Sequence, residues 1–417
     1  MNNQKVPKIR FKGFSGDWEQ RKLGDISTSY SGGTPTAGKD EYYGGIIPFI
    51  RSGEISSDHT ELFLTERGFN SSSAVMVKQG DILYALYGAT SGEVSISKLN
   101  GAINQAILAV LPNDGYDTDF IMQWLRKSKD SIVSTYLQGG QGNLSATIVN
   151  QLHIDLPSYN EQRRIGAFFK VLDNNITLHQ SKLDKLKIIK KSMLENCFPK
   201  NGENVPKFRF SGFTGDWEQC KLGETFTLLQ NNTLSRAELN EEKGVAKNVH
   251  YGDVLIKLSE CLDLSKESLP FIEQQSVVDK FKNASLQNGD VVVADTAEDE
   301  TVGKSTEIMG ITDEKVISGL HTIPLRPIQQ FSTGYLGYYF NSPSYHDQLK
   351  PHMQGIKVTS ISKGAILGTV IKFPSDLKEQ EQIGRFFLGL DHLITLHQSK
   401  LDKLKVIKKT LLESMFV

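Results

Sequence analysis

The sequence predicts an α+β protein in which two globular domains of mixed strands and helices alternate with two long helices. Two blocks that each occur twice, in the same order, lead to this prediction. Val6–Gly24 returns as Val205–Gly223 with 15 of 19 residues identical, and Glu161–Phe198 returns as Glu379–Phe416 with 26 of 38 identical. We call these blocks the frame. The segments between them, the inserts, are far less alike, which indicates one scaffold that carries two different sets of surface loops, where binding functions usually lie.

The repeats also predict the domain boundaries. We place a first domain at residues 1–160, a first helix at 161–198, a second domain at 199–378 and a second helix at 379–417. A chain of this length is expected to form about two to three domains. Each insert is long enough to bury a core of its own.

Within the inserts, short apolar runs bounded by turn residues predict strands. In the first insert these runs are residues 46–50, 81–88 and 102–112, and a helical spacing of apolar residues predicts a helix from Thr118, its expected N-cap, to Gly139. In the second insert we expect strands at 253–258, 290–295 and 320–325 and a helical piece near 335–340. Both inserts are therefore predicted to be mixed α+β.

The second frame block is the strongest helix prediction in the chain. Its apolar residues recur at alternating spacings of four and three, which is typical of a coiled-coil seam. The seam residues are Leu172, Ile176, Leu183, Leu186 and Met193 in the first copy and Leu390, Ile394, Leu401, Leu404 and Leu411 in the second. Since neither helix can bury this stripe alone, we expect them to form an antiparallel coiled coil. The alternative is that each helix packs only on its own domain.

Composition indicates a soluble protein of a reducing compartment. The three cysteines (Cys197, Cys220 and Cys261) are widely spaced and form no metal-binding pattern. No apolar run approaches the roughly 18 residues of a membrane span, and the N-terminus lacks the apolar region of a secretory signal. We therefore expect a cytoplasmic protein with no membrane association.

The formal net charge of −1 differs from the strongly basic balance of a protein that holds nucleic acid alone. One segment, His179–Lys191, carries five lysines and one aspartate, and its copy from His397 to Lys409 is equally basic. This segment is either a solvated helix face or a surface that follows phosphates.

Motifs for catalysis are missing from the sequence. Residues 33–40 nearly spell a phosphate-binding loop, but Asp40 replaces the hydroxyl residue that would hold magnesium. Ser91 lacks the GxSxG context of a nucleophile, and no HExxH motif is present. We predict no catalytic residue, no metal site and no cofactor in this chain.

Polar loops are better candidates for function. Gln and Asn can pair with adenine edges, and Arg can pair with guanine. The candidate DNA-binding residues in the two inserts are Thr34, Arg51, Tyr87, Thr90, Ser91, Gln138, Gln141, Asn143, Ser145, Lys257, His321, Lys357, Thr359, Ser360 and Lys363.

The whole chain resembles the DNA-specificity subunits of type I restriction-modification systems. The resemblance rests on GFxGDWEQxKLG, which occurs twice, and on residues 31–56, 81–96, 101–112, 156–165 and 373–383. It implies two target-recognition domains that each read one half of a bipartite, asymmetric DNA site, and two helices that act as a spacer. It also implies two methyltransferase subunits that hold S-adenosylmethionine and direct adenine methylation, and restriction (translocase/endonuclease) subunits that use ATP and magnesium.

The main alternative is a two-domain protein-interaction scaffold joined by its coiled coil, with no role in DNA binding. A nuclease or nucleotide hydrolase that acts alone is the third reading. The missing catalytic motifs disfavour it.

Overall fold

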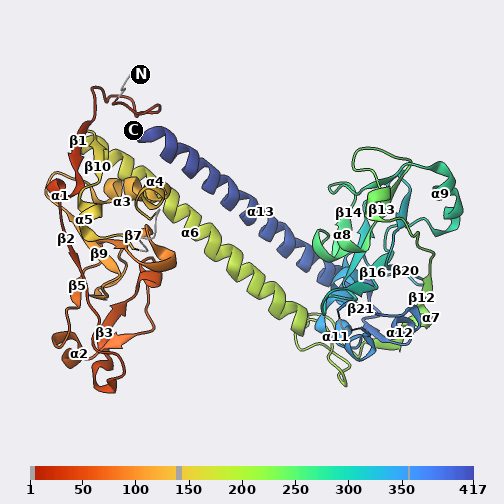
Figure 1. Cartoon of the computed structure of the whole chain (residues 1–417). Helices are drawn as coiled ribbons and strands as arrows, with labels where there is room; N and C mark the ends of the chain where they lie inside the picture. The colour runs from red at the N-terminus through yellow and green to blue at the C-terminus, as the bar shows by residue number, and fades with distance from the viewer. Residues whose placement is uncertain (1–4, 138–142, 356) are drawn as a thin grey trace. The chain divides into compact units, whose positions relative to one another are not determined.

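The computed structural model describes residues 5–137, 143–355 and 357–417 (Figure 1). The chain divides into two compact units, of which unit 1 comprises residues 1–180 and 398–417 and unit 2 comprises residues 181–397. Each unit contains one globular domain together with a segment of each long helix. The domain boundaries that the sequence predicts remain a proposal.

The globular part of unit 1 is built on two four-stranded sheets. The first has the order β2-β9-β6-β7 and is antiparallel, and the second has the order β4-β3-β8-β5, in which β3 and β8 run parallel. The strands are β2 (Ser27–Ser31), β3 (Tyr43–Ile50), β4 (Phe63–Leu64), β5 (Val75–Val77), β6 (Ile82–Ala85), β7 (Val94–Ile96), β8 (Gly101–Ile103) and β9 (Ile107–Pro112). A separate pair, β1 (Glu19–Lys22) and β10 (His153–Leu156), joins the first frame block to the end of the insert.

The described residues of this domain also form the short helices α1 (Leu23–Ile26), α2 (Glu66–Asn70), α3 (Thr118–Lys127), α4 (Lys129–Tyr136) and α5 (Ala146–Asn150). The side chain of Asp117, rather than Thr118, caps α3 by accepting a hydrogen bond from the Phe120 amide at 2.8 Å. The helix predicted from residue 118 onward breaks at Ser128 into α3 and α4.

Unit 2 repeats this scaffold with additions. Its main sheet has the order β12-β20-β16-β18-β14, a smaller sheet has the order β15-β13-β19, and two pairs are β11-β22 and β17-β21. The strands are β11 (Glu218–Lys221), β12 (Phe226–Leu228), β13 (Ala246–Val249), β14 (Cys261–Asp263), β15 (Phe271–Ile272), β16 (Val291–Ala294), β17 (Thr296–Ala297), β18 (Ser305–Met309), β19 (Val316–Ser318), β20 (Thr322–Pro327), β21 (Thr359–Ser360) and β22 (Val370–Phe373). The helices are α7 (Leu222–Thr225), α8 (Tyr251–Ile256), α9 (Gln275–Lys280), α10 (Tyr335–Asn341), α11 (Pro343–His346) and α12 (Lys363–Leu367).

The α+β prediction is confirmed, but two predicted strands need correction. Residues 253–258 lie mainly in helix α8, because His250 caps the Gly252 amide and the buried Val254 and Leu258 recur at helical spacing. The run 102–112 is two strands, β8 and β9, separated by a three-residue turn. The strands expected at 46–50 and 290–295 and the helix near 335–340 are present as β3, β16 and α10.

The two predicted long helices are α6 (Tyr159–Asn196) and α13 (Leu377–Met415). In unit 1 the Phe169 and Phe416 rings lie 5.8 Å apart, and the Lys408 ammonium contacts the Asp173 carboxylate. Asp173 follows Phe169 in the first repeat, whereas its partner Lys408 precedes Phe416 in the second. The two helices therefore run antiparallel here. The seam residues Leu183, Leu390 and Leu401 are buried. A continuous coiled coil from one unit to the other remains a prediction.

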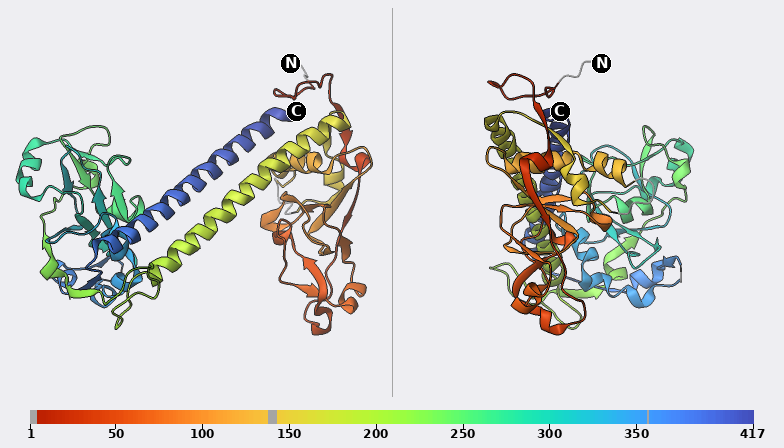
Figure 2. Two further views of the ribbon diagram at one scale, coloured as in Figure 1. Left: turned by 180° about the vertical axis from the view of Figure 1, so that it is seen from behind. Right: turned by 60° about the vertical axis from the view of Figure 1, so that its left-hand side comes forward.

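The end of each long helix completes an aromatic core. In unit 1, Phe416 lies 6.4 Å from the Trp18 ring and 5.0 Å from the Phe120 ring. The N-terminal segment lies beside the end of α13 (Figure 2). The Ile9 amide there donates to the Ser414 carbonyl at 2.9 Å.

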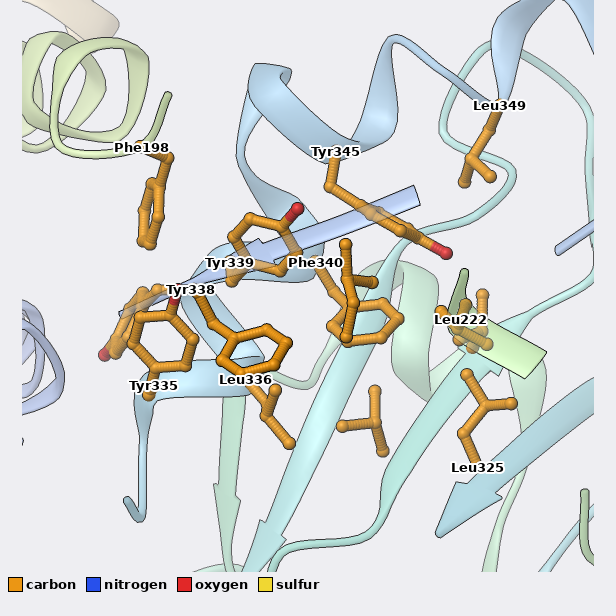
Figure 3. Close-up of a cluster of buried hydrophobic side chains, with 14 of the residues drawn as sticks. Phe198, Leu222, Leu325, Tyr335, Leu336, Tyr338, Tyr339, Phe340, Tyr345 and Leu349 are labelled. Atoms are coloured by element: carbon orange, nitrogen blue, oxygen red, sulfur yellow. The ribbon is translucent and has the colours of Figure 1, made fainter. Parts of the chain in front are cut away.

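The equivalent core of unit 2 contains Phe198, which lies 6.4 Å from Trp217 and 6.0 Å from Tyr335. Figure 3 shows Phe198 in this core beside Tyr335 and Tyr339. Each core therefore combines a frame tryptophan, an insert aromatic residue and the last phenylalanine of a helix repeat.

The frame blocks are also fastened to each other by ion pairs. Arg10 Nε contacts Glu161 Oε1 at 2.7 Å in unit 1, and Arg209 Nε contacts Glu379 Oε1 at 2.8 Å in unit 2. Both arginines also donate to backbone carbonyls of their own GFxGDW loops. This geometry explains why the two frame blocks repeat together.

Asp173 in unit 1 and Asp391 in unit 2 occupy equivalent positions of the helix repeat, but the charged side chains around them differ. In unit 1, burial opposes ionisation of Asp173, but Arg126 and Lys408 outweigh it and lower the pKa of Asp173. In unit 2, Lys190 contacts Asp391 at 2.6 Å and Glu260 at 2.8 Å. Since one cation serves two carboxylates, burial prevails and raises the pKa of Asp391.

Unit 2 also buries a carboxylate at the start of α10. Glu307 accepts hydrogen bonds from the amides of Gly334 at 2.8 Å and Gly337 at 2.9 Å. Although these bonds favour the charged form, burial raises the pKa of Glu307 to about 7.

Replacing Phe416 by Ala should destabilise unit 1, because it leaves a cavity beside Trp18 and Phe120. The expected loss is about 3–5 kcal/mol. Hydrogen exchange of unit 1 amides during a denaturant series measures it. Phe63→Ala, at a position of the same unit that is 37% exposed, is the control and should cost less. Equal protection of wild type and Phe416→Ala would show that the helix end is dispensable.

Glu307 should make unit 2 less stable as pH rises. Its pKa is about 7 when folded and near the ordinary 4.5 when unfolded, so the folded state keeps a proton that the unfolded state releases across this interval. The contribution lost between pH 4.5 and 8 is roughly 3 kcal/mol. Glu307→Gln should flatten the slope of unfolding free energy against pH. Identical slopes for both proteins would refute this assignment.

Candidate nucleic-acid interface

In unit 1, polar loops from four parts of the chain meet beside the end of β6. Tyr87 forms an isolated antiparallel bridge with Asn143, and the Leu144 amide donates to the Leu86 carbonyl at 3.0 Å. These contacts join the loop that follows β6 to the loop that precedes α5. Two of the predicted residues, Tyr87 and Asn143, are therefore neighbours.

The turn between β8 and β9 contacts the loop that follows β6. The Leu86 amide donates to the Ala106 carbonyl at 2.8 Å, and the Thr34 hydroxyl donates to the Gln105 side-chain carbonyl. The Gly33 amide donates to the Ile103 carbonyl at 3.2 Å. We call residues 32–34, 86–91, 104–106 and 143–145 the loop cluster of unit 1.

Unit 2 places corresponding loops together by the same backbone contacts. The Asp295 amide donates to the His321 carbonyl at 3.0 Å, and the Ile361 amide donates to the Asp295 carbonyl at 2.9 Å. Thr296 pairs with Ser360 in the β17–β21 ladder. Residues 231–233, 295–297, 319–321 and 359–363 form the loop cluster of unit 2. His321, Thr359, Ser360 and Lys363, all candidates from the sequence, lie in it.

Several candidate side chains have structural partners inside the loop cluster. The buried Ser91 hydroxyl donates to the Leu86 carbonyl at 3.2 Å, and the Thr90 hydroxyl donates to the Tyr87 carbonyl at 3.3 Å. Ser145 caps α5 by accepting from the Ile148 amide at 3.2 Å. In unit 2 Ser362 caps α12 in the same way. Asn143 is exposed and Tyr87 is half-buried, whereas the exposed Thr34 and Ser145 are engaged in hydrogen bonds.

Lysine candidates of unit 2 lie in different settings. Lys363 Nζ is 3.3 Å from the Asn231 side-chain carbonyl within the loop cluster. Lys357 is exposed, and Lys257 is the C-cap residue of α8, where it contacts Asp253 at 3.2 Å. Gln138 and Gln141 lie outside the described residues.

Arg51 directly follows β3, whose last residue Ile50 pairs with Ile103 beside the 104–106 turn, and its charge is neutralised locally. Its guanidinium contacts Glu54 at 2.7 Å and Glu61 at 3.3 Å. The hydrogen bond from Arg51 lowers the pKa of Glu54 to about 2. To read guanine, Arg51 would first have to leave these carboxylates.

Sequence reasoning missed Gln105, Thr296 and Asn231, which the structure brings into the loop clusters. Gln105 was hidden because residues 102–112 were interpreted as one strand. The polar pair Asn104–Gln105 inside an otherwise apolar run was the available signal of a turn.

A second feature occurs once in each unit, where the lysine-rich part of a helix repeat borders a cleft. The cleft of unit 1 has a volume of 440 Å³ and that of unit 2 has a volume of 330 Å³. Five repeat positions line both, and we call these the lysine clefts: Lys405, Lys408, Lys409, Leu412 and Glu413 in unit 1, and Lys187, Lys190, Lys191, Leu194 and Glu195 in unit 2.

Exposed apolar residues flank each lysine cleft. Ile188 is 67% exposed and Val406, its equivalent in the other repeat, is 65% exposed. The adjacent Ile189 and Ile407 are also exposed. A duplicated surface that combines lysines with exposed aliphatic side chains is suited to a protein partner, since phosphates gain nothing from the apolar part.

Within the described residues, no group of three or more His, Cys, Asp or Glu side chains is arranged to hold a metal ion. Among the described helices, none combines the length and hydropathy needed to cross a bilayer.

Known proteins resemble this chain over nearly its whole length. The family model described as the type I restriction modification DNA specificity domain matches twice, at residues 15–188 and 214–406. The MjaVIII specificity subunit of a type I restriction enzyme from Methanocaldococcus jannaschii is 22% identical over 407 residues, which cover 95% of this chain and 91% of that protein.

The EcoR124I/EcoR124II specificity subunit from Escherichia coli is 27% identical over 174 residues, which cover 39% of this chain and 43% of that protein. The crystal structure of a type I restriction-modification S subunit from M. genitalium matches with a TM-score of 0.63 at 15% identity and covers 99% of both chains. The structural likeness supports the two-domain fold.

Proposed function

Because this chain belongs to the type I restriction modification DNA specificity family, we propose that it is the specificity subunit that selects the DNA site for a restriction-modification enzyme. The subunit is non-catalytic. It recognises a bipartite, asymmetric DNA sequence and directs adenine methylation and restriction by its partner subunits.

One observation carries this proposal. The same backbone contacts assemble a loop cluster in each unit, yet the side chains that the two loop clusters present differ. At the equivalent bridge, Tyr87 and the exposed Asn143 in unit 1 correspond to Thr296 and the exposed Ser360 in unit 2. A shared scaffold with different exposed groups is what reading two different half-sites requires, since base edges are distinguished by their pattern of donors and acceptors.

The candidate contacts follow from this placement. We propose that Tyr87 and Asn143 in unit 1, and His321, Thr359, Ser360, Lys357 and Lys363 in unit 2, approach the DNA. The other described candidates of unit 1, and Lys257 of unit 2, already have hydrogen-bond or ion-pair partners within the chain. The two long helices would set the number of base pairs between the half-sites.

We further propose two methyltransferase subunits as direct partners, each docked at one lysine cleft and its flanking aliphatic residues. A partner that fits one copy of this surface fits the other, because five lining positions are equivalent. S-adenosylmethionine would be held by these partners, and ATP and magnesium by restriction subunits, in the cytoplasm. The alternative of a scaffold without a DNA role predicts the same docking but no DNA binding.

Mapping of methylated adenines tests the function. The full chain, produced with its methyltransferase partner, should yield one interrupted motif with different half-sites and one modified adenine in each, on opposite strands. Exchange of the first insert for that of another family member should change one half-site only. A continuous palindromic motif, or no sequence-dependent methylation, would refute the proposal.

Substitution of Ile188 or Val406 by Asp tests the docking surface, since burying a new carboxylate against a partner is costly. Each single variant should retain one methyltransferase subunit, and the double variant none, as counted by native mass spectrometry. Ile46→Asp, which changes an exposed isoleucine outside both clefts, should retain two. If both single variants also retain two, the partner docks elsewhere.

A further inference from the structure

We propose that one turn of the shared scaffold determines base specificity in both units, through Gln105 in unit 1 and His321 in unit 2. This inference rests on the proposed DNA-reading function and names side chains that perform it.

The two turns occupy the same place in the scaffold. The turn of residues 104–106 joins β8 to β9, and the turn of residues 319–321 joins β19 to β20. Each comprises three residues, and the strand that follows pairs with its neighbour in the same register, Ile107 with Ala85 and Thr322 with Ala294. In unit 1 the first two residues, Asn104 and Gln105, are polar and Gln105 is the exposed one, whereas in unit 2 the polar residue is the last one, His321.

The backbone at His321 is strained. Its φ of +54° is positive, which no other non-glycine residue among those described shares. Only a few per cent of non-glycine residues adopt this conformation, with Asn, Asp and His the commonest among them, and such strain tends to persist at functional sites. Glycine would fit this turn without strain, so the histidine side chain is what the position gains.

The ring of His321 is held in place on one side and open on the other. Its Nδ1 lies 3.3 Å from Asp295 Oδ1 and 3.3 Å from Thr296 Oγ1, and the Tyr251 ring packs edge-on at 5.2 Å. The side chain is nevertheless 47% exposed, and no described residue forms a hydrogen bond with Nε2. Since Asp295 would repel a phosphate, the open edge is suited to a base rather than to the DNA backbone.

Gln105 offers different chemistry at the equivalent turn. Its side-chain carbonyl accepts the Thr34 hydroxyl, which orients the amide, while the residue itself is exposed. A glutamine amide can both donate to and accept from an adenine edge. The turn of unit 1 thus presents a side-chain amide to the DNA bases, and the turn of unit 2 presents an imidazole.

The turn of unit 2 rests on a buried polar network. The Asn232 amide group donates to Asn248 Oδ1 at 2.6 Å and to the Ser318 carbonyl at 3.0 Å. The Thr322 hydroxyl donates to the Gly319 carbonyl, so the residues on both sides of the turn are fixed. A side chain that is positioned this firmly can discriminate between bases without first becoming ordered.

Gln105→Ala and His321→Gly, made in the full chain and assembled with methyltransferase partners, test the inference. Each should relax one base position in one half-site and leave the other half-site unchanged. Affinity for the cognate duplex should fall roughly 5- to 100-fold, whereas affinity for unrelated DNA and the dependence on salt should stay within twofold of wild type. His321→Gly removes the backbone strain, so loss of reading cannot be attributed to misfolding.

Ile46→Ala and Ile328→Ala, at exposed positions outside the loop clusters, are the controls and should leave the motif unchanged. If the wild type methylates a bipartite motif and both turn variants retain it with full affinity, the turn does not read bases and the proposed function stands. If the wild type itself shows no bipartite motif, the proposed function fails first.

Discussion

The structure depends on one packing constraint, which is that the core of each unit is closed by the end of a helix that begins in the other half of the sequence. Phe416 fills the core beside Trp18, and Phe198 fills the core beside Trp217. Aromatic side chains bury large areas, so neither core is complete without this residue. The adjacent Lys408–Asp173 and Lys190–Asp391 contacts fix the helices at the same register in both units.

Because the frame supplies this closure twice, the inserts are free to differ elsewhere. Their loop clusters lie at strand ends, where side chains can change without disturbing the sheets. The frame thus provides stability and the inserts provide recognition. Even so, the frame copies are unequal in charge, since Arg126 joins the pair in unit 1 and Glu260 joins it in unit 2.

Much of this architecture could be predicted from the sequence, because a repeat of 38 residues with a seam pattern is a strong and local signal. The long helices and the two mixed domains follow from it. Tyr87 and Asn143 were candidates in two separate loops, and only the structure makes them neighbours. Features that depend on tertiary contact could not be predicted. The sequence does not show that Glu54 and Glu61 pair with Arg51. Gln105 lies within an otherwise apolar run, which concealed the turn. The lysine clefts form only where residues of each domain lie against the helix repeat.

The way α3 and α10 dock onto the long helices limits which inserts the frame can accept. The amides of Asp117 and Ser332 donate to Gln162 and Gln380, an aromatic ring follows three residues later, and a side-chain donor to Asp173 or Asp391 follows six residues later, supplied by Gln123 or Tyr338. Recombination between relatives can therefore create a working chimera only when the incoming insert supplies all three contacts: the amide donor, the aromatic ring and the side-chain donor. New DNA specificities would arise by exchange among inserts that make these contacts. An insert without them would leave a frame tryptophan without its aromatic packing partner.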